Sequence, residues 1–421
     1  MLAMQFIREH PDAVRRSLAL RHVEAPLEEA LSLDEDRRRL LREVEALKAD
    51  RNEAGRAIGK ARDGATREQL IAAQREVAGR IDALDVELRE VDRRLCDALS
   101  AIPNVVDSLV PEGAGEEDNV VMREEGERRV FDFEPKPHWD IGEALGIIEF
   151  EAAAAIAGTR MYVLKGKGAQ LQRALVGYFL DTHASNGYTE VYLPAIVREK
   201  SMWASGQLPK FRDNLYHDAE EDYWLIPTAE VPLTNLHRDT VLDEGDLPLR
   251  YVAHTPCFRR EKMSAGRDVR GIKRVHQFEK VEIYQFTTPE QSTAAHQEML
   301  AAAELLLQEL GLAYRVVQLS SGDLGFSATA SYDLEVWSPG VREWVEVSSI
   351  SNCAAFQARR ANVRVRGLKR KPEFVHTLNG SGLPTGRVLA AILETYQRSD
   401  GGVAVPEVLQ HRMGRLMQVT P

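Results

Sequence analysis

The stretch from Cys257 to Phe286 concentrates side chains whose types and spacing could do chemistry. Its pattern predicts two β-strands joined by a basic, glycine-containing loop. Because side chains alternate faces along a strand, Arg259 and Glu261 are expected on one side of the first strand. Phe278 and Glu282 are expected on one side of the second strand, about 13 Å apart. One face would then carry an aromatic ring, a guanidinium and a carboxylate over the length of an amino acid joined to an adenylate.

The simpler interpretation of this stretch is a charged hairpin whose polar face points into water. Two further side chains, His276 and Lys280, fall on the same predicted face as the ring and the carboxylate of the second strand. The connecting loop adds the positive charges of Arg267, Arg270 and Lys273. This density of functional groups on one face favours a binding site.

The elements that position these residues belong to a chain of 421 residues, which is long enough for two or three domains. Hydrophobic residues make up 44% of the chain and charged residues 28%, which is typical of soluble globular proteins. The sequence contains no long apolar run, so no membrane span is expected. Its start lacks the apolar core of an export signal, which predicts a cytoplasmic protein.

The cysteines and the net charge limit the kinds of partner. Cys96, Cys257 and Cys353 are far apart and form no CxxC or Cys/His pattern, so neither a zinc site nor a disulfide framework is expected. The formal net charge of −11 argues against indiscriminate binding of nucleic acids. It leaves room for a local basic surface.

Two apolar heptad runs between about residues 31 and 102 predict an antiparallel hairpin of long helices. The second run is the cleaner one, with apolar residues at alternating spacings of three and four from Leu70 to Ile102. This is the 3.5-residue repeat of a left-handed coiled coil. The first run would form a rod roughly 40 Å long. In the loop between the runs, Thr66 and Gln69 are predicted to form a capping box for the second helix.

The hairpin has two interpretations. It is either a solvated coiled coil for dimerisation or spacing, or an arm that reaches a partner through contacts to phosphates. The candidate phosphate contacts are Arg37, Arg38, Arg39, Arg56, Lys60, Arg62, Arg75, Arg93 and Arg94.

After an acidic linker at 112–119, the pattern predicts an antiparallel sheet flanked by helices, and so an α+β fold. The predicted helices are Ala169–Ser185, Pro289–Leu310 and Gly386–Gln397. The predicted strands are Gly187–Val197, Leu249–Phe258, Val275–Phe286, Tyr314–Leu319, Ser331–Trp337, Trp344–Asn352 and Asn362–Arg366.

Three short motifs in this region add polar side chains. The segment Pro227–Glu230, PTAE, places a hydroxyl and a carboxylate two residues apart, and Val345–Asn352 places Glu346 near two serines. The segment His376–Arg387 predicts a glycine-rich loop that opens onto an amphipathic helix, where free N–H groups favour anions. Arg387 would lie in the first turn of that helix, where the dipole disfavours a cation. An anionic ligand is the better explanation for a cation at that position.

The sequence contains no Ser/His/Asp or Cys/His nucleophile set, Walker loop or HExxH motif. Adenylation needs no enzyme nucleophile, because the carboxylate of the substrate attacks the α-phosphate once charge and geometry are supplied. The parts expected for that reaction are guanidinium groups, a carboxylate that holds a metal and an aromatic plate.

On these motifs the chain resembles the bacterial-type seryl-tRNA synthetases, of the class II aminoacyl-tRNA synthetases, along essentially its whole length. The matching segments are the helical hairpin, NGYTEVYLPAIV with Pro194, SGQLPKF, TAE, FRRE with RGIKRVHQFEKVE, EVSSISN, FQARRAN and HTLNGSG…GR. The resemblance implies an N-terminal tRNA-binding domain over 1–110 and a class II catalytic domain over 111–421. Motif 1 would span about 169–197, motif 2 about 249–286 and motif 3 about 376–397.

The resemblance implies a serine–tRNA ligase. Such an enzyme activates L-serine with ATP and Mg²⁺ and transfers it to the 3′ end of tRNA-Ser, and also of tRNA-Sec. It also implies a homodimer with motif 1 at the interface, and a helical arm that lies against the long variable arm of tRNA-Ser and reads it by shape. The arm residues expected to contact tRNA are Arg37, Arg38, Arg56, Lys60, Arg62 and Arg75.

Residue roles follow from the resemblance position by position. Arg259, Glu346 and Arg387 would be catalytic, with Arg259 on the α-phosphate and Arg387 on the γ-phosphate. Phe278 would stack on the adenine, and Glu346 and Ser349 would bind the metal. The implied serine-binding residues are Thr228, Glu230, Glu282, Asn379 and Ser381. The implied ATP-binding residues are Arg259, Arg260, Glu261, Val275, Phe278, Glu346, Val347, Ser348, Ser349 and Arg387.

Two details qualify these roles. Glu346 and Ser349 would point to opposite faces of an unbroken strand, so a bulge or a strand end is expected there. In the motif 2 loop, FRRE replaces the more familiar FRSE through Arg260, and Lys262 and Met263 replace a small pair. The contacts made by this loop therefore stay open.

Three alternatives come from other classes. A carrier-protein amino-acid ligase on the same fold would lack the helical arm. A non-catalytic RNA-binding paralogue would be expected to have lost Arg259, Glu346 or Arg387, and all three are present. A duplicate enzyme that confers resistance to an antibiotic mimicking seryl-adenylate has the same sequence features as a housekeeping copy.

Overall fold

The computed structural model describes residues 1–262, 270–367 and 371–420. Met263 and Arg267, which were singled out in the sequence, lie outside the described residues. The contacts divide the chain into two units. The smaller unit comprises Leu2–Ala19 and Val23–Pro103, and the larger comprises Met1, Leu20–His22 and Asn104–Pro421.

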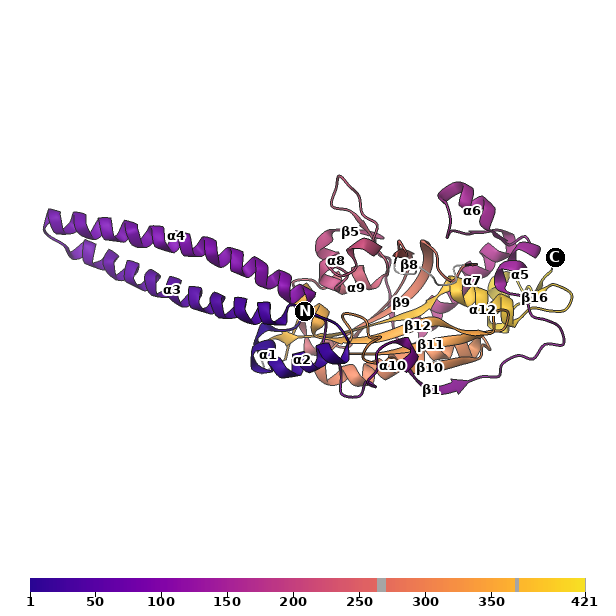
Figure 1. Cartoon of the computed structure of the whole chain (residues 1–421). Helices are drawn as coiled ribbons and strands as arrows, with labels where there is room; N and C mark the ends of the chain where they lie inside the picture. The colour runs from indigo at the N-terminus through magenta and orange to yellow at the C-terminus, as the bar shows by residue number, and fades with distance from the viewer. Residues whose placement is uncertain (263–269, 368–370, 421) are drawn as a thin grey trace. The chain divides into compact units, whose positions relative to one another are not determined.

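The smaller unit consists of helices, as the heptad pattern predicts. Two short helices, α1 (Met4–Glu9) and α2 (Pro11–Leu20), precede α3 (Leu27–Lys60) and α4 (Gly64–Ala101). The last two lie side by side as a hairpin (Figure 1). At the rise of an α-helix, the 34 residues of α3 span roughly 50 Å, because the helix begins well before the heptad run.

The hairpin is held together by a narrow apolar seam and by ion pairs along its edges. Leu40 and Val44 pack against Leu84, and Arg37 Nε lies 2.6 Å from Asp92 Oδ1 across the two helices. The predicted capping box is wrong. Asp63 caps α4 instead, because its carboxylate accepts hydrogen bonds from both the N–H and the hydroxyl of Thr66.

The larger unit is built on one eight-stranded sheet. Its strand order is β1 (Val120–Glu125), β10 (Tyr314–Gln318), β11 (Ala330–Ser338), β12 (Glu343–Ala354), β15 (His376–Pro384), β9 (Gln277–Thr287), β8 (Leu249–Phe258) and β4 (Thr189–Glu190). Neighbouring strands are antiparallel except for the pair β4 and β8. The sheet confirms the predicted α+β class.

Helices pack on both faces of this sheet. The helices α7 (Gly166–Ser185), α10 (Ser292–Glu309) and α12 (Thr385–Thr395) share one large core with it. On the other face, α9 (Glu230–Asn235) and α11 (Phe356–Ala361) belong to a smaller core. The helix α8 (Glu199–Ser205) contacts both α9 and α11, and α5 (His138–Ala144) contacts α12.

The remaining elements are short. The helices are α6 (Phe150–Ala157) and α13 (Glu407–Gln410). The strands are β2 (Ile148–Glu149), β3 (Val163–Leu164), β5 (Ile196–Val197), β6 (Trp224–Leu225), β7 (Val241–Asp243), β13 (Arg364–Arg366), β14 (Glu373–Phe374), β16 (Val403–Ala404) and β17 (Gln418–Val419). Within the described part of the chain, no helix has the length and apolar character needed to cross a membrane.

Successive side chains of β9 point to opposite faces of the sheet, so each face carries its own set of residues. Ile283 lies in the large core with α7, α10 and α12. Lys280 and Glu282 point to the opposite face, where they line a cavity. Further along that same face, Tyr284 and Phe286 pack in the smaller core. The sequence of β9 therefore places a polar site beside a closed apolar core on one face.

Three details of the predicted sheet are wrong. The expected strand Gly187–Val197 forms only the short strands β4 and β5. Arg259 and Glu261 do not share a strand face, because β8 ends at Phe258 and Glu261 has φ +50°. The glycine-rich segment before α12 is the strand β15 rather than a loop.

Candidate active site

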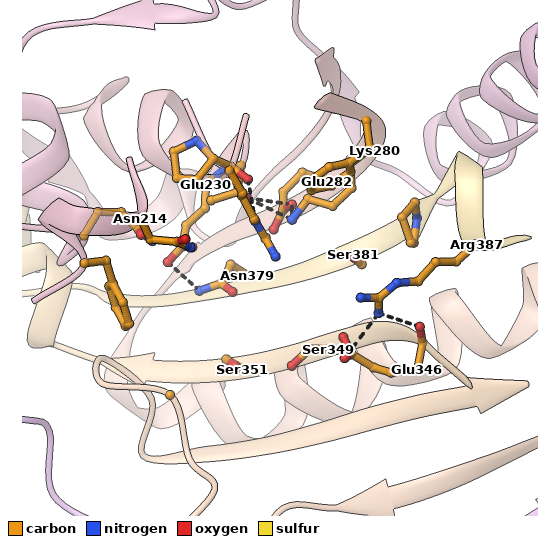
Figure 2. A pocket seen from close by; sticks show the side chains of 18 of the residues that line it. Asn214, Glu230, Lys280, Glu282, Glu346, Ser349, Ser351, Asn379, Ser381 and Arg387 are labelled. Carbon is orange, nitrogen blue, oxygen red and sulfur yellow. Dashed lines mark hydrogen bonds and ion pairs between the residues drawn. The ribbon is translucent and has the colours of Figure 1, made fainter. Parts of the chain in front are cut away.

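A cavity of about 590 Å³ opens on the polar face of the sheet. Its walls come from β9, β12 and β15, from the segments on either side of the motif 2 loop, and from the PTAE segment. The residues given catalytic, serine-binding or ATP-binding roles that line it are Thr228, Glu230, Arg259, Glu261, Val275, Phe278, Glu282, Glu346, Val347, Ser349, Asn379, Ser381 and Arg387. Figure 2 shows Glu282, Glu346, Ser349, Asn379 and Ser381 converging from separate strands.

Two of the residues predicted to bind ATP do not line the cavity. Ser348 is fully buried and its hydroxyl donates a 2.7 Å hydrogen bond to the carbonyl of Ser381. Arg260 uses its backbone N–H to bind the carbonyl of Asn214 at 3.0 Å. Ser348 therefore joins β12 to β15, and the main chain of Arg260 helps to hold the start of the motif 2 loop.

One end of the cavity is a chain of hydrogen bonds between buried polar side chains. Lys280 Nζ donates to Thr228 Oγ1 at 2.9 Å, and this hydroxyl donates to Glu282 Oε2 at 3.0 Å. Lys280 and Glu282 also form an ion pair, with side chains only 9% and 2% exposed. Because each buried charge has a partner, this end presents a fixed carboxylate to a ligand.

Glu230 supplies a second carboxylate at this end. Asn379 Nδ2 donates to Glu230 Oε1 at 3.1 Å, and Gln357 Nε2 donates to the same oxygen. Burial and then the negative charge of Glu282 raise the pKa of Glu230 to about 7, although the charge of Lys280 acts in the opposite direction. Its charge therefore changes near neutral pH.

A ring and a guanidinium lie in the middle of the cavity. The Arg259 Cζ atom is 5.1 Å from the centroid of the Phe278 ring, which is a cation–π contact. Arg259 Nε donates to the carbonyl of Pro227 at 3.3 Å, and the backbone N–H of Arg259 donates to the carbonyl of His276 at 2.9 Å. Glu261 lies beyond them, 3.8 Å from Arg274 Nη1.

At the other end, Arg387 at the start of α12 binds the strand β12. Its Nη1 donates to the Glu346 carbonyl at 2.7 Å and lies 3.3 Å from Glu346 Oε2. Its Nε donates to the Lys273 carbonyl at 3.2 Å. Enclosure by the cavity walls would raise the pKa of Glu346, but the charge and hydrogen bond of Arg387 outweigh it and the pKa is lowered. The Glu346 side chain is 46% exposed, so an ionised carboxylate faces the cavity.

The bulge predicted between Glu346 and Ser349 is present. In the pairing of β11 with β12, Leu334 lies opposite Ser348 and Glu335 lies opposite Glu346, so Val347 is the extra residue. Glu346 and Ser349 consequently both line the cavity.

These two residues form an oxygen donor set that fits Mg²⁺, which takes a carboxylate and keeps waters or phosphate oxygens as its other ligands. Behind Ser349, Asp333 is its register partner on β11, and no described residue gives a hydrogen bond to Asp333 Oδ1. Burial and then the charge of Glu346 raise the pKa of Asp333 well above its usual value. A cation at Glu346 and Ser349 would offset the repulsion between the two carboxylates.

Several lining residues were absent from the set expected in the sequence. Strand alternation places Lys280 on the face of Phe278 and Glu282, and it does line the cavity, but no role was assigned to it. Asn214, Ser351 and Cys353 also line the cavity, and no local pattern marks them. Only the tertiary structure brings them to it.

The arrangement has a clear chemical consequence. Glu230 and Glu282 lie at one end of the cavity, and Arg387 lies with Glu346 at the other (Figure 2). The Arg259 guanidinium and the Phe278 ring, in contact with each other, also line it. Such a site can bind the ammonium group of an amino acid and a polyphosphate at the same time, with the amino acid carboxylate near the α-phosphate.

Comparisons with known proteins agree with this chemistry. The model of the seryl-tRNA synthetase N-terminal domain matches residues 1–106, and the class II tRNA synthetase core domain (G, H, P, S and T) matches residues 211–396. A serine–tRNA ligase from Roseiflexus sp. (strain RS-1) is 56% identical over 416 residues, which cover 98% of each chain. The chain belongs to the seryl-tRNA synthetase family.

Two solved structures extend the likeness to the whole fold. The seryl-tRNA synthetase from Pyrococcus horikoshii, complexed with ATP, is 39% identical with a TM-score of 0.94, and the match covers 100% of both chains. The cytoplasmic serine–tRNA ligase from Naegleria fowleri, in complex with AMP, is 32% identical with a TM-score of 0.88. That match covers 100% of this chain and 99% of the other.

Proposed function

We propose that the cavity binds L-serine and ATP together and that both steps of the reaction take place in it. As a member of the seryl-tRNA synthetase family, the chain is an ATP-dependent serine–tRNA ligase. In the first step serine and ATP give seryl-adenylate and pyrophosphate. In the second step the terminal ribose 3′-hydroxyl of a tRNA attacks the activated carbonyl, the bond to the phosphate breaks and AMP leaves. One observation carries the proposal, namely that the enclosed carboxylates of Glu230 and Glu282 line the same cavity as the guanidinium groups of Arg259 and Arg387.

The serine amino group binds at the carboxylate end. Glu282 and Glu230 face this end with fixed partners, which supports contacts to the ammonium and the hydroxyl of serine. Thr228 holds Glu282, and Asn379 holds Glu230. Ser381, which also lines the cavity, completes the predicted serine pocket. A buried site built for a hydroxyl rejects alanine because its polar groups would be left unpaired.

ATP binds at the guanidinium end. Phe278 presents a half-buried ring for the adenine. Arg259 crosses that ring at 5.1 Å and lies between it and the serine pocket, which supports a contact to the α-phosphate. Arg387 is proposed to bind the γ-phosphate and the departing pyrophosphate. Glu261, Val275, Val347, Ser349 and the main chain of Arg260 would form the surrounding wall.

The mechanism needs positioning and charge rather than an enzyme nucleophile. The serine carboxylate forms a bond to the α-phosphorus while the bond to the β-phosphate oxygen breaks, and pyrophosphate leaves. Arg259 stabilises the charge that develops at the α-phosphate, since a guanidinium group can donate two parallel hydrogen bonds to phosphate oxygens. Glu346 and Ser349 would hold Mg²⁺, which when bound neutralises the charge of the β- and γ-phosphates.

We further infer that the first unit binds tRNA-Ser and also tRNA-Sec. In the part of the hairpin that the structure describes, Arg56, Lys60, Arg62 and Arg75 are exposed and form no ion pair. These residues are therefore available to phosphates. Two other predicted contacts are engaged elsewhere, because Arg37 pairs with Asp92 and Arg38 pairs with Asp34.

The remaining proposals concern assembly and location. We propose a homodimer with motif 1 at its interface, supported by Tyr192 and Ile196, whose apolar side chains are exposed in this monomer. We also propose that the domain boundary near residue 110 separates tRNA binding from catalysis. A cytosolic location is supported by the unpaired thiols of Cys96, Cys257 and Cys353.

Pyrophosphate exchange measured with each of the twenty amino acids tests the proposed function. Serine should support exchange at least 100-fold better than alanine or glycine, as estimated from the discrimination of sites that bind a substrate hydroxyl. Threonine keeps the hydroxyl and should be rejected sterically, through its extra methyl group. Exchange with a different amino acid, or none with any, would overturn the assignment of the cavity.

A further inference from the structure

A fully buried histidine and glutamate form a pair away from the residues assigned above. His138 of α5 and Glu394 of α12 are both 0% exposed, and His138 Nδ1 lies 2.7 Å from Glu394 Oε1. The backbone N–H of His138 donates to the same oxygen at 3.0 Å. The Ser338 hydroxyl and the Gly340 N–H donate to the other carboxylate oxygen. The carboxylate is therefore saturated and holds the imidazole in one orientation.

This arrangement fixes the roles of both ring nitrogens of His138. Nδ1 donates to the carboxylate, so Nε2 is left as an acceptor, and the backbone N–H of Ile272 donates to it at 3.1 Å. Gly271 precedes this contact with φ +72°, and a Cβ there would lie 2.1 Å from His138 Nε2. The imidazole therefore sets the path of the chain at Gly271 and Ile272.

The same segment meets Arg387 one residue later. Ile272 and Lys273 both line the cavity, and the Lys273 carbonyl accepts a hydrogen bond from Arg387 Nε at 3.2 Å. Arg387 and Glu394 are seven residues apart on α12, which is about two helical turns and puts them on one face. One helix therefore holds the segment at two points, directly through Arg387 and through His138 by way of Glu394.

Stability alone does not account for this pair. Replacing both partners of a buried hydrogen bond by well-packed apolar side chains can be nearly neutral or stabilising, so such a pair is weak evidence for a stabilising role. Here the free nitrogen of the imidazole is directed at a main-chain N–H in the wall of the site. An apolar side chain at 138 would leave that N–H without its acceptor.

We propose that His138 is a positioning residue for ATP. It fixes the main chain at Ile272 and Lys273, and through the Lys273 carbonyl it orients the guanidinium of Arg387. This inference deepens the proposed function and rests on the contact assigned there between Arg387 and the γ-phosphate.

The substitution His138→Asn separates the two nitrogens, because the asparagine amide can replace the Nδ1 donor but supplies no acceptor at the position of Nε2. Measured by pyrophosphate exchange, it should raise the KM for ATP about tenfold, or about 1.4 kcal/mol, and leave the KM for serine within about twofold. In an Arg387→Ala background the same substitution should change the KM for ATP by less than about twofold, because the two residues act through one contact.

A matched control lies at the same end of α12. Tyr396→Phe removes the hydrogen bond from the Tyr396 hydroxyl to the Leu310 carbonyl, which does not involve the segment at 271–273. It should lower the melting temperature and leave the KM for ATP unchanged. If His138→Asn does not fold, Glu394→Gln replaces it, since the amide keeps an acceptor for His138 but opposes the Gly340 N–H. That variant should raise the KM for ATP about threefold in the same selective way.

The outcomes are distinct. The positioning role would be overturned if His138→Asn raised the KM for ATP by the same factor in the wild type and in the Arg387→Ala background. It would also be overturned if the substitution raised the KM for ATP and the KM for serine equally, or changed neither. If Arg387→Ala itself has the wild-type KM for ATP, the proposed contact of Arg387 with ATP fails, and the inference fails with it.

Discussion

At the scale of single residues, the serine end of the cavity consists of buried charges that are paired with one another but line the site. Lys280 and Glu282 neutralise each other in a part of the sheet with almost no exposure. Thr228 bridges them, so the position of the Glu282 carboxylate is fixed before serine arrives. Pre-organised charge of this kind contributes to binding because little ordering remains to be done.

The substitution Glu282→Gln tests this residue without leaving Thr228 unpaired, since the amide oxygen can still accept its hydrogen bond. Losing the charge should raise the KM for serine roughly 100-fold, from the 1.5–3 kcal/mol of a hydrogen bond to a charged group. The KM for ATP should stay within about twofold. Both constants come from pyrophosphate exchange.

Glu304→Gln is the matched control for that measurement. Glu304 is also a buried glutamate with a cationic partner, Arg123, but it lies outside the cavity. It should lose stability and keep the serine KM of the wild type. Similar increases in the two variants, or parallel changes in both KM values for Glu282→Gln, would contradict the serine contact.

The protonation of Glu230 should make serine activation depend on pH. With its pKa raised to about 7, the side chain is mostly neutral below that pH and loses its attraction for the serine ammonium. The value of kcat/KM for serine should therefore rise with pH up to about 7 and then level off, since this ratio reports the free enzyme. Glu230→Gln should remove this step, and a step that persists unchanged in the variant would assign it to another group.

At the scale of elements, the sequence predicts the fold where patterning is strong. The bounds of β8 are as predicted, and β9 and α10 differ from prediction by a few residues, because alternation and helical periodicity are long in those segments. The bulge at Val347 was predictable from a chemical requirement, namely that Glu346 and Ser349 share a face. Such a requirement is only available once the function is suspected.

The errors at this scale have physical causes. The glycines of β15 suggested a loop, but they mark close packing inside a central strand. A Cβ at Gly380 would lie 3.0 Å from Ile350 Cγ1, and one at Gly382 would lie 2.7 Å from His183 Nε2. The cap of α4 was misassigned because α4 begins before Thr66, whose N–H and hydroxyl donate to the Asp63 carboxylate. The close packing of the glycines depends on residues distant in the sequence, whereas the Asp63 cap is a local pattern that the sequence could have shown.

At the scale of elements, the exposed cations of the hairpin α3–α4 are predicted to bind tRNA. Replacing Arg56, Lys60, Arg62 and Arg75 by alanine should lower kcat/KM for tRNA-Ser at least tenfold, because exposed cations without carboxylate partners contribute to phosphate binding. The slope of log affinity against log salt should fall by about 1 for each cation that binds a phosphate in the wild type. Aminoacylation and tRNA binding across a salt series provide the measurements.

Arg93→Ala is the comparison for the hairpin variant. Arg93 lies on the same helix as Arg75 but is engaged by Glu90 and Asp97. It should change tRNA binding by less than about twofold. Equal reductions for paired and unpaired arginines would mean that local ion pairing does not select the residues that bind tRNA.

At the scale of the whole molecule, we propose that recognition of a large RNA and chemistry on small molecules belong to different units of the chain. The cavity is lined entirely by residues of the larger unit, as far as the structure describes it. The hairpin has its own apolar seam of Leu40, Val44 and Leu84. Each unit therefore has the packing it needs to keep its own structure.

Shortening the hairpin tests this separation. Arg37 and Asp92 face each other across the two helices, so replacing residues 38–91 by a short glycine-serine turn cuts both helices at one level. Pyrophosphate exchange should stay within about twofold of the wild type, while aminoacylation of tRNA-Ser should fall at least 100-fold, because the cations that bind the tRNA phosphates are removed. Loss of both activities would show that the hairpin supports the catalytic unit.

A crystal structure with a non-hydrolysable analogue of seryl-adenylate would show whether one cavity holds serine and ATP in line. We expect the adenine against Phe278, the phosphate mimic on Arg259 and the ammonium on Glu282. An analogue whose ammonium lies away from Glu282, or whose base lies outside the Phe278 wall, would contradict this arrangement.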